Sequence, residues 1–94
     1  MRRKPHKLAK LGTTDPTGWT AVISTLGLPP QLARIVMLIL EGNGDKQIAA
    51  AMKISFSTVR TYLDRIFLRL GVHGRTELIV RLYAERDALL QVST

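Results

Sequence analysis

The sequence predicts an all-α fold. Apolar residues recur at the i, i+3, i+4 and i+7 spacing of helices along most of the chain, and no stretch alternates as a strand would. Glycine, proline and capping residues divide this pattern into short segments, so we expect several short helices. The chain has 94 residues, 46% of them hydrophobic, which suffices for one small core. We therefore expect one helical domain that follows a basic tail over residues 1–14.

Two helices are expected in the first half. Asp15 and Pro16 are suited to the N-cap and first position of a short extra helix within residues 15–27. The next helix is expected to begin at Pro29 and Pro30, because proline is tolerated only in the first turn, and to end near Gly42 and Gly44. Its residues are apolar on nearly every side, so it should lie at the centre of the domain.

Three helices are expected in the second half. Asp45 is suited to cap a helix that ends near Met52, and Ser55 to cap a longer helix over about Phe56–Leu70. The last helix should start after Gly74. The apolar side of the longer helix holds Val59, Tyr62, Leu63, Ile66, Phe67 and Leu70. Its other side is polar and therefore free to bind a partner.

The net charge of +7 is concentrated in two segments. Residues 1–12 contain five lysines and arginines and no acid, and residues 44–75 contain six basic against two acidic residues. The segments between and after them are slightly acidic. A basic segment inside the folded part indicates a surface that meets phosphate or another acidic partner.

Several classes of function are not expected. Cysteine is absent, which removes disulfides, thiolate nucleophiles and sulfur-based zinc sites, and the only histidines are His6 and His73. No catalytic arrangement of carboxylates, nucleophile and base or phosphate-binding glycines is found, so we expect no enzyme, metal site or cofactor. No apolar run reaches the roughly 18 residues of a membrane span, and the N-terminus does not resemble a secretory signal. We expect a cytoplasmic protein.

Four pieces of sequence stand in a specific order. They are Glu41 with Gly44, Lys46-Gln47-Ile48-Ala49, Ile54-Ser55-x-x-Thr58-Val59-Arg60, and Leu70-Gly71-Val72 followed by Arg75-Thr76-Glu77-Leu78. From Leu28 to Arg81 the chain thereby resembles the LuxR-type (LuxR/FixJ) helix-turn-helix domain of bacterial transcription regulators. The resemblance implies a four-helix domain over residues 28–94. The chain departs from the family pattern at its start, where Leu28 to Arg34 lack the usual acids.

The resemblance implies a recognition helix over Phe56–Leu70 in the major groove of double-stranded DNA. It places Arg60, Thr61 and Asp64 against base edges. For Asp64 a salt bridge to an arginine of the same helix is an equally good interpretation. The residues expected to contact the DNA backbone are Lys46, Ser57, Thr58, Tyr62, Arg65, Arg69 and Arg75.

The resemblance also implies a homodimer through the last helix, from Thr76 to Gln91. This segment has more apolar residues than one face requires. The alternative is that Leu89 and Leu90 only cover the extra N-terminal helix. Trp19 on that helix is expected in the core.

Two other interpretations of function remain open. Phe56 and Leu68 fall on the outward side of the longer helix, which favours a protein-interaction module that acts as adaptor or antagonist of another regulator. A promoter-binding domain of the sigma-factor kind ranks last, because it does not explain the pieces after Leu70. Only 27 residues precede Leu28. That is too few for a sensor domain, so we expect a stand-alone effector or a piece of a larger protein, and a start at Met1 favours the former.

Overall fold

The computed structural model describes residues 17–92, which form five helices and no strand. The all-α prediction is confirmed. The basic tail over residues 1–14, Asp15 and Pro16 lie outside the described residues. The helices are α2 (Trp19–Thr25), α3 (Pro30–Leu40), α4 (Asp45–Met52), α5 (Phe56–Leu70) and α6 (Arg75–Val92).

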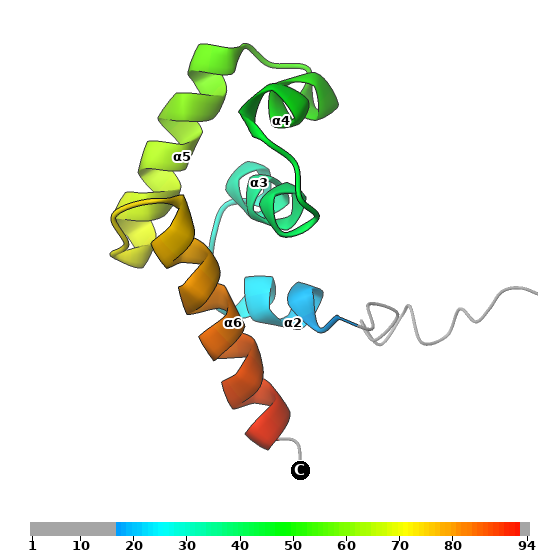
Figure 1. Ribbon diagram of the computed structural model, residues 1–94, viewed down its shortest axis with the longest axis vertical. Coiled ribbons are helices and arrows are strands. Elements are labelled where there is room, and N and C mark those ends of the chain that lie inside the picture. Colours follow the sequence, from blue (N-terminus) through cyan, green and yellow to red (C-terminus); the bar gives the residue numbers. More distant parts are fainter. Residues whose placement is uncertain (1–16, 93–94) are drawn as a thin grey trace, which may run out of the picture.

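Helix α3 lies at the centre, as its apolar composition predicts. It packs against α2, α4 and α5, and α4 packs against α5 (Figure 1). Helix α6 leaves the end of α5 and runs past α2, which contacts both α3 and α6 (Figure 1). The Arg81 guanidinium donates a 2.6 Å hydrogen bond to the Leu70 carbonyl oxygen. This bond satisfies an unpaired acceptor at the end of α5 and joins that end to α6.

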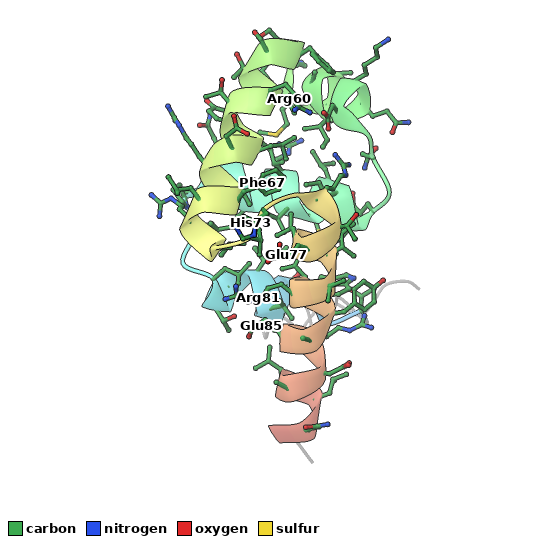
Figure 2. The ribbon with its side chains drawn as sticks, turned by 60° about the vertical axis from the view of Figure 1, so that its left-hand side comes forward. Arg60, Phe67, His73, Glu77, Arg81 and Glu85 are labelled. Atoms are coloured by element: carbon green, nitrogen blue, oxygen red, sulfur yellow. The ribbon has the colours of Figure 1, made fainter. Side chains whose placement is uncertain are left out.

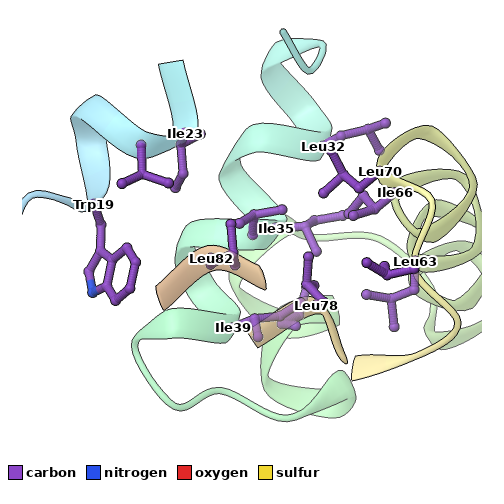
Figure 3. Packing of buried hydrophobic residues seen from close by; sticks show 14 of the residues in the cluster. Trp19, Ile23, Leu32, Ile35, Ile39, Leu63, Ile66, Leu70, Leu78 and Leu82 are labelled. Atoms are coloured by element: carbon purple, nitrogen blue, oxygen red, sulfur yellow. The ribbon is translucent and has the colours of Figure 1, made fainter. Parts of the chain in front are cut away.

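One hydrophobic core receives side chains from all five helices (Figure 3). Helix α5 contributes Val59, Leu63, Ile66 and Leu70, which recur every three or four residues and therefore lie on one side. Burial of a side chain of this size contributes about 1.5–3 kcal/mol. Trp19 is in the core, as predicted, with 6% of its surface exposed. The core thus includes the extra helix α2.

The start of α2 differs from the prediction. The helix begins at Trp19, and its N-cap is Gly18 in the left-handed conformation, with a φ of 81°. A residue with that φ cannot continue a right-handed helix, which places the boundary after Gly18. The Thr17 hydroxyl accepts a 3.2 Å hydrogen bond from the Trp19 N–H. The extra helix is therefore shorter than the sequence pattern predicts.

The cap of α4 also differs from the prediction. Gly44 is the N-cap, and its N–H donates to the Gln47 side-chain oxygen at 2.7 Å. Asp45 is the first residue of the helix, and its carboxylate accepts hydrogen bonds from two arginines instead. The cap prediction for Ser55 is confirmed, because its hydroxyl accepts the Thr58 N–H at 3.0 Å.

Candidate nucleic-acid interface

Helices α4 and α5 form a helix-turn-helix unit. Lys53 ends α4 in the left-handed conformation, with a φ of 57°, and Ser55 caps α5 two residues later. The Ile54 N–H donates to the Ala49 carbonyl oxygen at 3.0 Å, which closes the turn. This short connection brings the start of α5 beside α4 and leaves one side of α5 uncovered.

The three predicted base-contact residues lie on that uncovered side. Thr61 and Asp64 are exposed, and the Arg60 side chain is 61% exposed. Val59, just before Arg60, and Leu63, just before Asp64, are buried. Arg60 lies in the first half of α5, toward α4 (Figure 2). The α5 side chains are thus divided as the sequence predicts, with an apolar inner side and a polar outer side.

The predicted backbone contacts are mostly at the surface. Lys46, Ser57, Arg65 and Arg69 are exposed, whereas Thr58, Tyr62 and Arg75 are half-buried. The Ser55 hydroxyl lies 3.1 Å from the Ser57 hydroxyl and 2.8 Å from the Thr58 hydroxyl, so three hydroxyl groups meet at the start of α5. The Arg65 guanidinium lies 5.7 Å from the centre of the Tyr62 ring.

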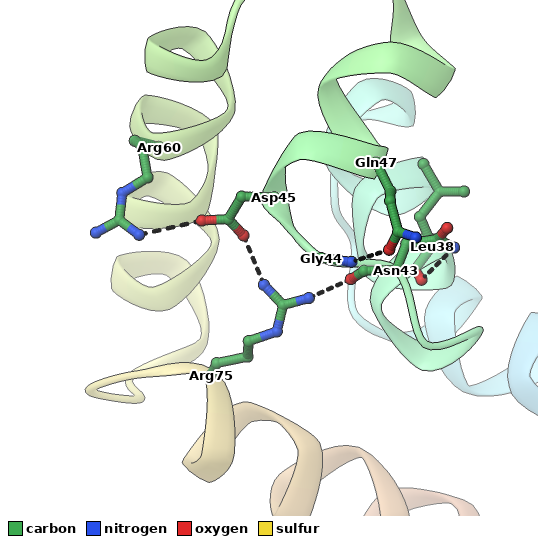
Figure 4. Close-up of polar contacts among 7 residues, drawn as sticks. All are labelled: Leu38, Asn43, Gly44, Asp45, Gln47, Arg60 and Arg75. Carbon is green, nitrogen blue, oxygen red and sulfur yellow. Dashed lines mark hydrogen bonds and ion pairs between the residues drawn. The ribbon is translucent and has the colours of Figure 1, made fainter.

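A carboxylate joins two of the predicted contact arginines. Arg60 contacts one Asp45 oxygen at 3.2 Å, and Arg75 contacts the other at 2.7 Å (Figure 4). Arg75 also donates a hydrogen bond to the Asn43 carbonyl oxygen (Figure 4). The sequence pattern does not predict this arrangement, because 15 and 30 residues separate Asp45 from its partners. No local pattern predicts contacts over that distance.

Asp64 differs from Asp45 in its surroundings. Within residues 17–92, no ion pair joins Asp64 to an arginine of α5 or to any other cation. Its exposed carboxylate is therefore available to a partner.

A matching family model decides the assignment. The model of the luxR family of bacterial regulatory proteins matches residues 31–82, more than half of the 94-residue chain. The chain belongs to this family. The α4–α5 helix-turn-helix lies entirely within the matched range.

Individual relatives agree with this assignment. A probable HTH-type transcriptional regulator, GfsR, from Streptomyces halstedii is 35% identical over 57 residues, which are 61% of this chain and 24% of the relative. The monoamine regulon transcriptional regulator of Klebsiella aerogenes is 47% identical over 47 residues, 50% of this chain and 21% of the relative. The response regulator VraR of Staphylococcus aureus is 35% identical over 57 residues, 61% of this chain and 26% of the relative.

The luxR-family chain spans about a quarter of the length of these relatives. No solved structure matches it at a significant level. The family match begins at Gln31 and ends at Leu82. It therefore includes nearly all of α3 and the whole of α4 and α5, and leaves α2 and the second half of α6 outside.

The loop between α5 and α6 carries one titratable contact. The His73 N–H and ring Nδ1 both lie 3.1 Å from one Glu77 carboxylate oxygen (Figure 2). The hydrogen bond from the His73 side chain, followed by that from its N–H, lowers the pKa of Glu77 below its ordinary value. In residues 17–92 no cluster of histidine and acidic side chains is arranged to hold a metal ion. No helix in this range is both long and apolar enough to cross a membrane.

Proposed function

We propose that this chain binds double-stranded DNA in a sequence-specific manner as a bacterial transcription regulator, with α5 in the major groove. The observation that carries the proposal is the exposed polar side of α5 in a domain whose family is established. The major groove is wide enough to admit an α-helix, and α5 has 15 residues with one uncovered side. The DNA target implies a location in the cytoplasm, at the nucleoid.

Each base contact has a chemical rationale. Arg60 is assigned to guanine, because a guanidinium can donate two hydrogen bonds to the O6 and N7 atoms. Thr61 is assigned to a thymine methyl group, and Asp64 to the amino group of cytosine. Asp64 has no ion-pair partner within residues 17–92, which supports a role toward DNA.

The backbone contacts set the register of the helix and carry no sequence information. We assign this role to exposed cations and to the hydroxyl groups at the start of α5. They are Lys46, Ser57, Thr58, Tyr62, Arg65, Arg69 and Arg75. For Arg75 the assignment requires that the remaining donors of a guanidinium already bonded to Asp45 and Asn43 reach a phosphate.

We also propose a homodimer through α6, and residues 28–94 as the DNA-binding unit. Val80 is 63% exposed and Leu90 54%, so the outer side of α6 presents apolar surface, while Tyr83, 47% exposed, packs edge to face against the Trp19 ring. Leu78 and Leu82 are fully buried in the core, and Leu89 packs partly against it. Leu90 thus supports the dimer interpretation, whereas Leu89 supports the alternative that the end of α6 covers α2.

A second candidate function is a protein-interaction module. Leu68 is 84% exposed and Phe56 49% exposed, both on α5, and exposed apolar side chains mark protein interfaces. The surrounding arginines favour DNA. The two candidates differ in how binding depends on salt.

Salt dependence tests the proposed function. If a dimer neutralises about eight phosphates, the logarithm of the affinity for duplex DNA falls against the logarithm of the salt concentration with a slope near −7. Selection of bound duplexes from a random pool at two salt concentrations measures both the slope and the sequence preference. A nearly flat slope, or the absence of any selected sequence, contradicts the proposal.

A further inference from the structure

The Asp45 carboxylate is shared by two helices that it does not belong to. It stands in the first turn of α4 and contacts Arg60 of α5 at 3.2 Å and Arg75 of α6 at 2.7 Å. Its side chain is only 17% exposed. Figure 4 shows the carboxylate between the two guanidinium groups. One acidic group therefore holds the proposed reading arginine from the side of α4.

The two arginines are held to different degrees. The Arg75 side chain is 34% exposed and is bonded at two points, to Asp45 and to the Asn43 carbonyl oxygen. The Arg60 side chain is 61% exposed and is bonded to the carboxylate through one nitrogen. Arg75 thus fixes the carboxylate in place, whereas Arg60 keeps its other donors at the surface.

An exposed ion pair contributes little to stability. Its stronger consequence is geometric, because a free arginine side chain samples many rotamers and one bonded to a fixed carboxylate samples few. Base recognition by a guanidinium requires two donors in one plane with the guanine acceptors. A freely moving arginine on the same surface instead reaches phosphates, which carry no sequence information.

We infer that Asp45 is a positioning residue for Arg60 and thereby a determinant of base specificity. The inference rests on the proposed function, because the contact of Asp45 with Arg60 would give DNA binding its selectivity at one base pair. The carboxylate restricts the orientation of the Arg60 guanidinium before DNA arrives. It also offsets one positive charge on the DNA-facing surface, so it lowers the affinity for any sequence while it raises the preference for one base.

The test compares base preference between variants. A preferred duplex is first selected from a random pool with the parent chain. The base pair read by Arg60 is then the one at which Arg60→Ala loses the preference that the parent shows. Asp45→Asn should then lower the preference at that base pair by about fivefold or more. It should leave the preference at the other base pairs and the binding to random duplexes undiminished. The Asp45→Asn, Arg60→Ala double variant should lose no more preference than Arg60→Ala alone.

Glu41→Gln is the matched control, because it removes one carboxylate charge as Asp45→Asn does. Glu41 is exposed and lies four residues before Asp45. The control variant should leave all base preferences unchanged. The Asp45→Asn variant could instead bind the preferred duplex more tightly and keep its preference at the Arg60 base pair. That result would mean that Asp45 only masks the charge of Arg60, and it would overturn the inference. A parent chain without any sequence preference overturns the proposed function and this inference together, so the two failures are distinguishable.

A measurement on the parent chain avoids any effect of substitution on folding. The ¹⁵N heteronuclear NOE of the arginine Nε–H groups reports how far each side chain is ordered. The Arg60 value should exceed the Arg69 value, because Arg69 is exposed on the same helix and has no ion-pair partner within residues 17–92. Equal values for the two arginines overturn the inference.

Discussion

Two regions of the molecule use arginine in opposite ways. On the α4–α5 side, Arg60 is bonded to a carboxylate and mostly exposed. On the α2–α6 side, the Arg86 guanidinium lies 4.4 Å from the Trp19 ring centre and 5.0 Å from the Tyr83 ring centre, and its Nε is buried without a hydrogen-bond partner. The first arrangement keeps donors for a ligand. The second uses the cation for packing against aromatic rings.

The two regions also differ in their relation to the luxR-family match. Arg60 and Asp45 lie inside residues 31–82, whereas Trp19, Tyr83 and Arg86 all lie outside them. The Trp19 and Tyr83 rings meet edge to face, with their centres 4.9 Å apart, and Arg86 donates a 3.1 Å hydrogen bond to the Thr17 carbonyl oxygen. We therefore assign the α2–α6 contact to the stability of the domain, whereas the α4–α5 surface is the one proposed to bind DNA.

The largest effect is expected from Trp19→Ala. The substitution removes a side chain that is 6% exposed and leaves a cavity at the α2–α6 contact, which should lower the free energy of unfolding by about 3–5 kcal/mol. Urea unfolding measures the change. Molecules that remain folded should bind duplex DNA as the parent does. As a control, Leu68→Ala at an exposed position should change the stability by about 0.5 kcal/mol or less.

The opposite pattern is expected from Arg60→Ala. It should weaken binding to the preferred duplex by about 1–3 kcal/mol and relax the preference at one base pair, with little effect on stability. Lys46→Ala should weaken binding to all sequences alike, because it removes a phosphate contact. Titration of each variant with matched and mismatched duplexes measures both effects. If both variants bind duplex DNA as the parent does, the surface assigned to DNA is wrong.

The proposed dimer uses the outer side of α6, whereas the inner side of α6 packs in the core. Val80→Glu places a charge on the exposed apolar side of α6, whereas the buried Leu78 and Leu82 stay in place. The variant should dissociate at concentrations where the parent is a dimer, and it should lose affinity for a duplex with two half-sites more than for one with a single half-site. Sedimentation and duplex titration measure these changes. A parent chain that is already monomeric on the two-half-site duplex contradicts the dimer.

The smallest effect concerns the loop between the two regions. Because the pKa of Glu77 is lowered in the folded chain, its contact with His73 stabilises the fold above the ordinary carboxyl pKa and is lost as the pH falls through the lowered value. Glu77→Gln should therefore remove a small part of the stability difference between about pH 6 and about pH 3. Thermal unfolding of both proteins at the two pH values measures it. An unchanged difference in the variant would exclude this contact as a source of pH dependence.

Local signals predicted the bounds of α5. Ser55 and Gly71 are the capping residues directly before and after α5, so the sequence predicts both ends of this helix. The spacing of the apolar residues between them predicts which side of the helix faces the core. Two features depend on distant contacts and were not predicted. Asp45 is a good cap by its residue type, but arginines from α5 and α6 bind its carboxylate. The start of α2 depends on the left-handed Gly18, whose neighbourhood includes the Arg86 side chain, 68 residues further along the chain.

Mapping the surface of the chain that meets DNA tests whether α5 is the helix that binds it. A duplex selected from a random pool is added to ¹⁵N-labelled protein, and the amide shifts are followed. We expect the largest changes at Ser57, Thr61 and Asp64 on α5 and at Lys46 on α4, and small changes on α2. Changes confined to α2 and α6, or none at duplex concentrations that saturate binding, would contradict a DNA-reading role for α5.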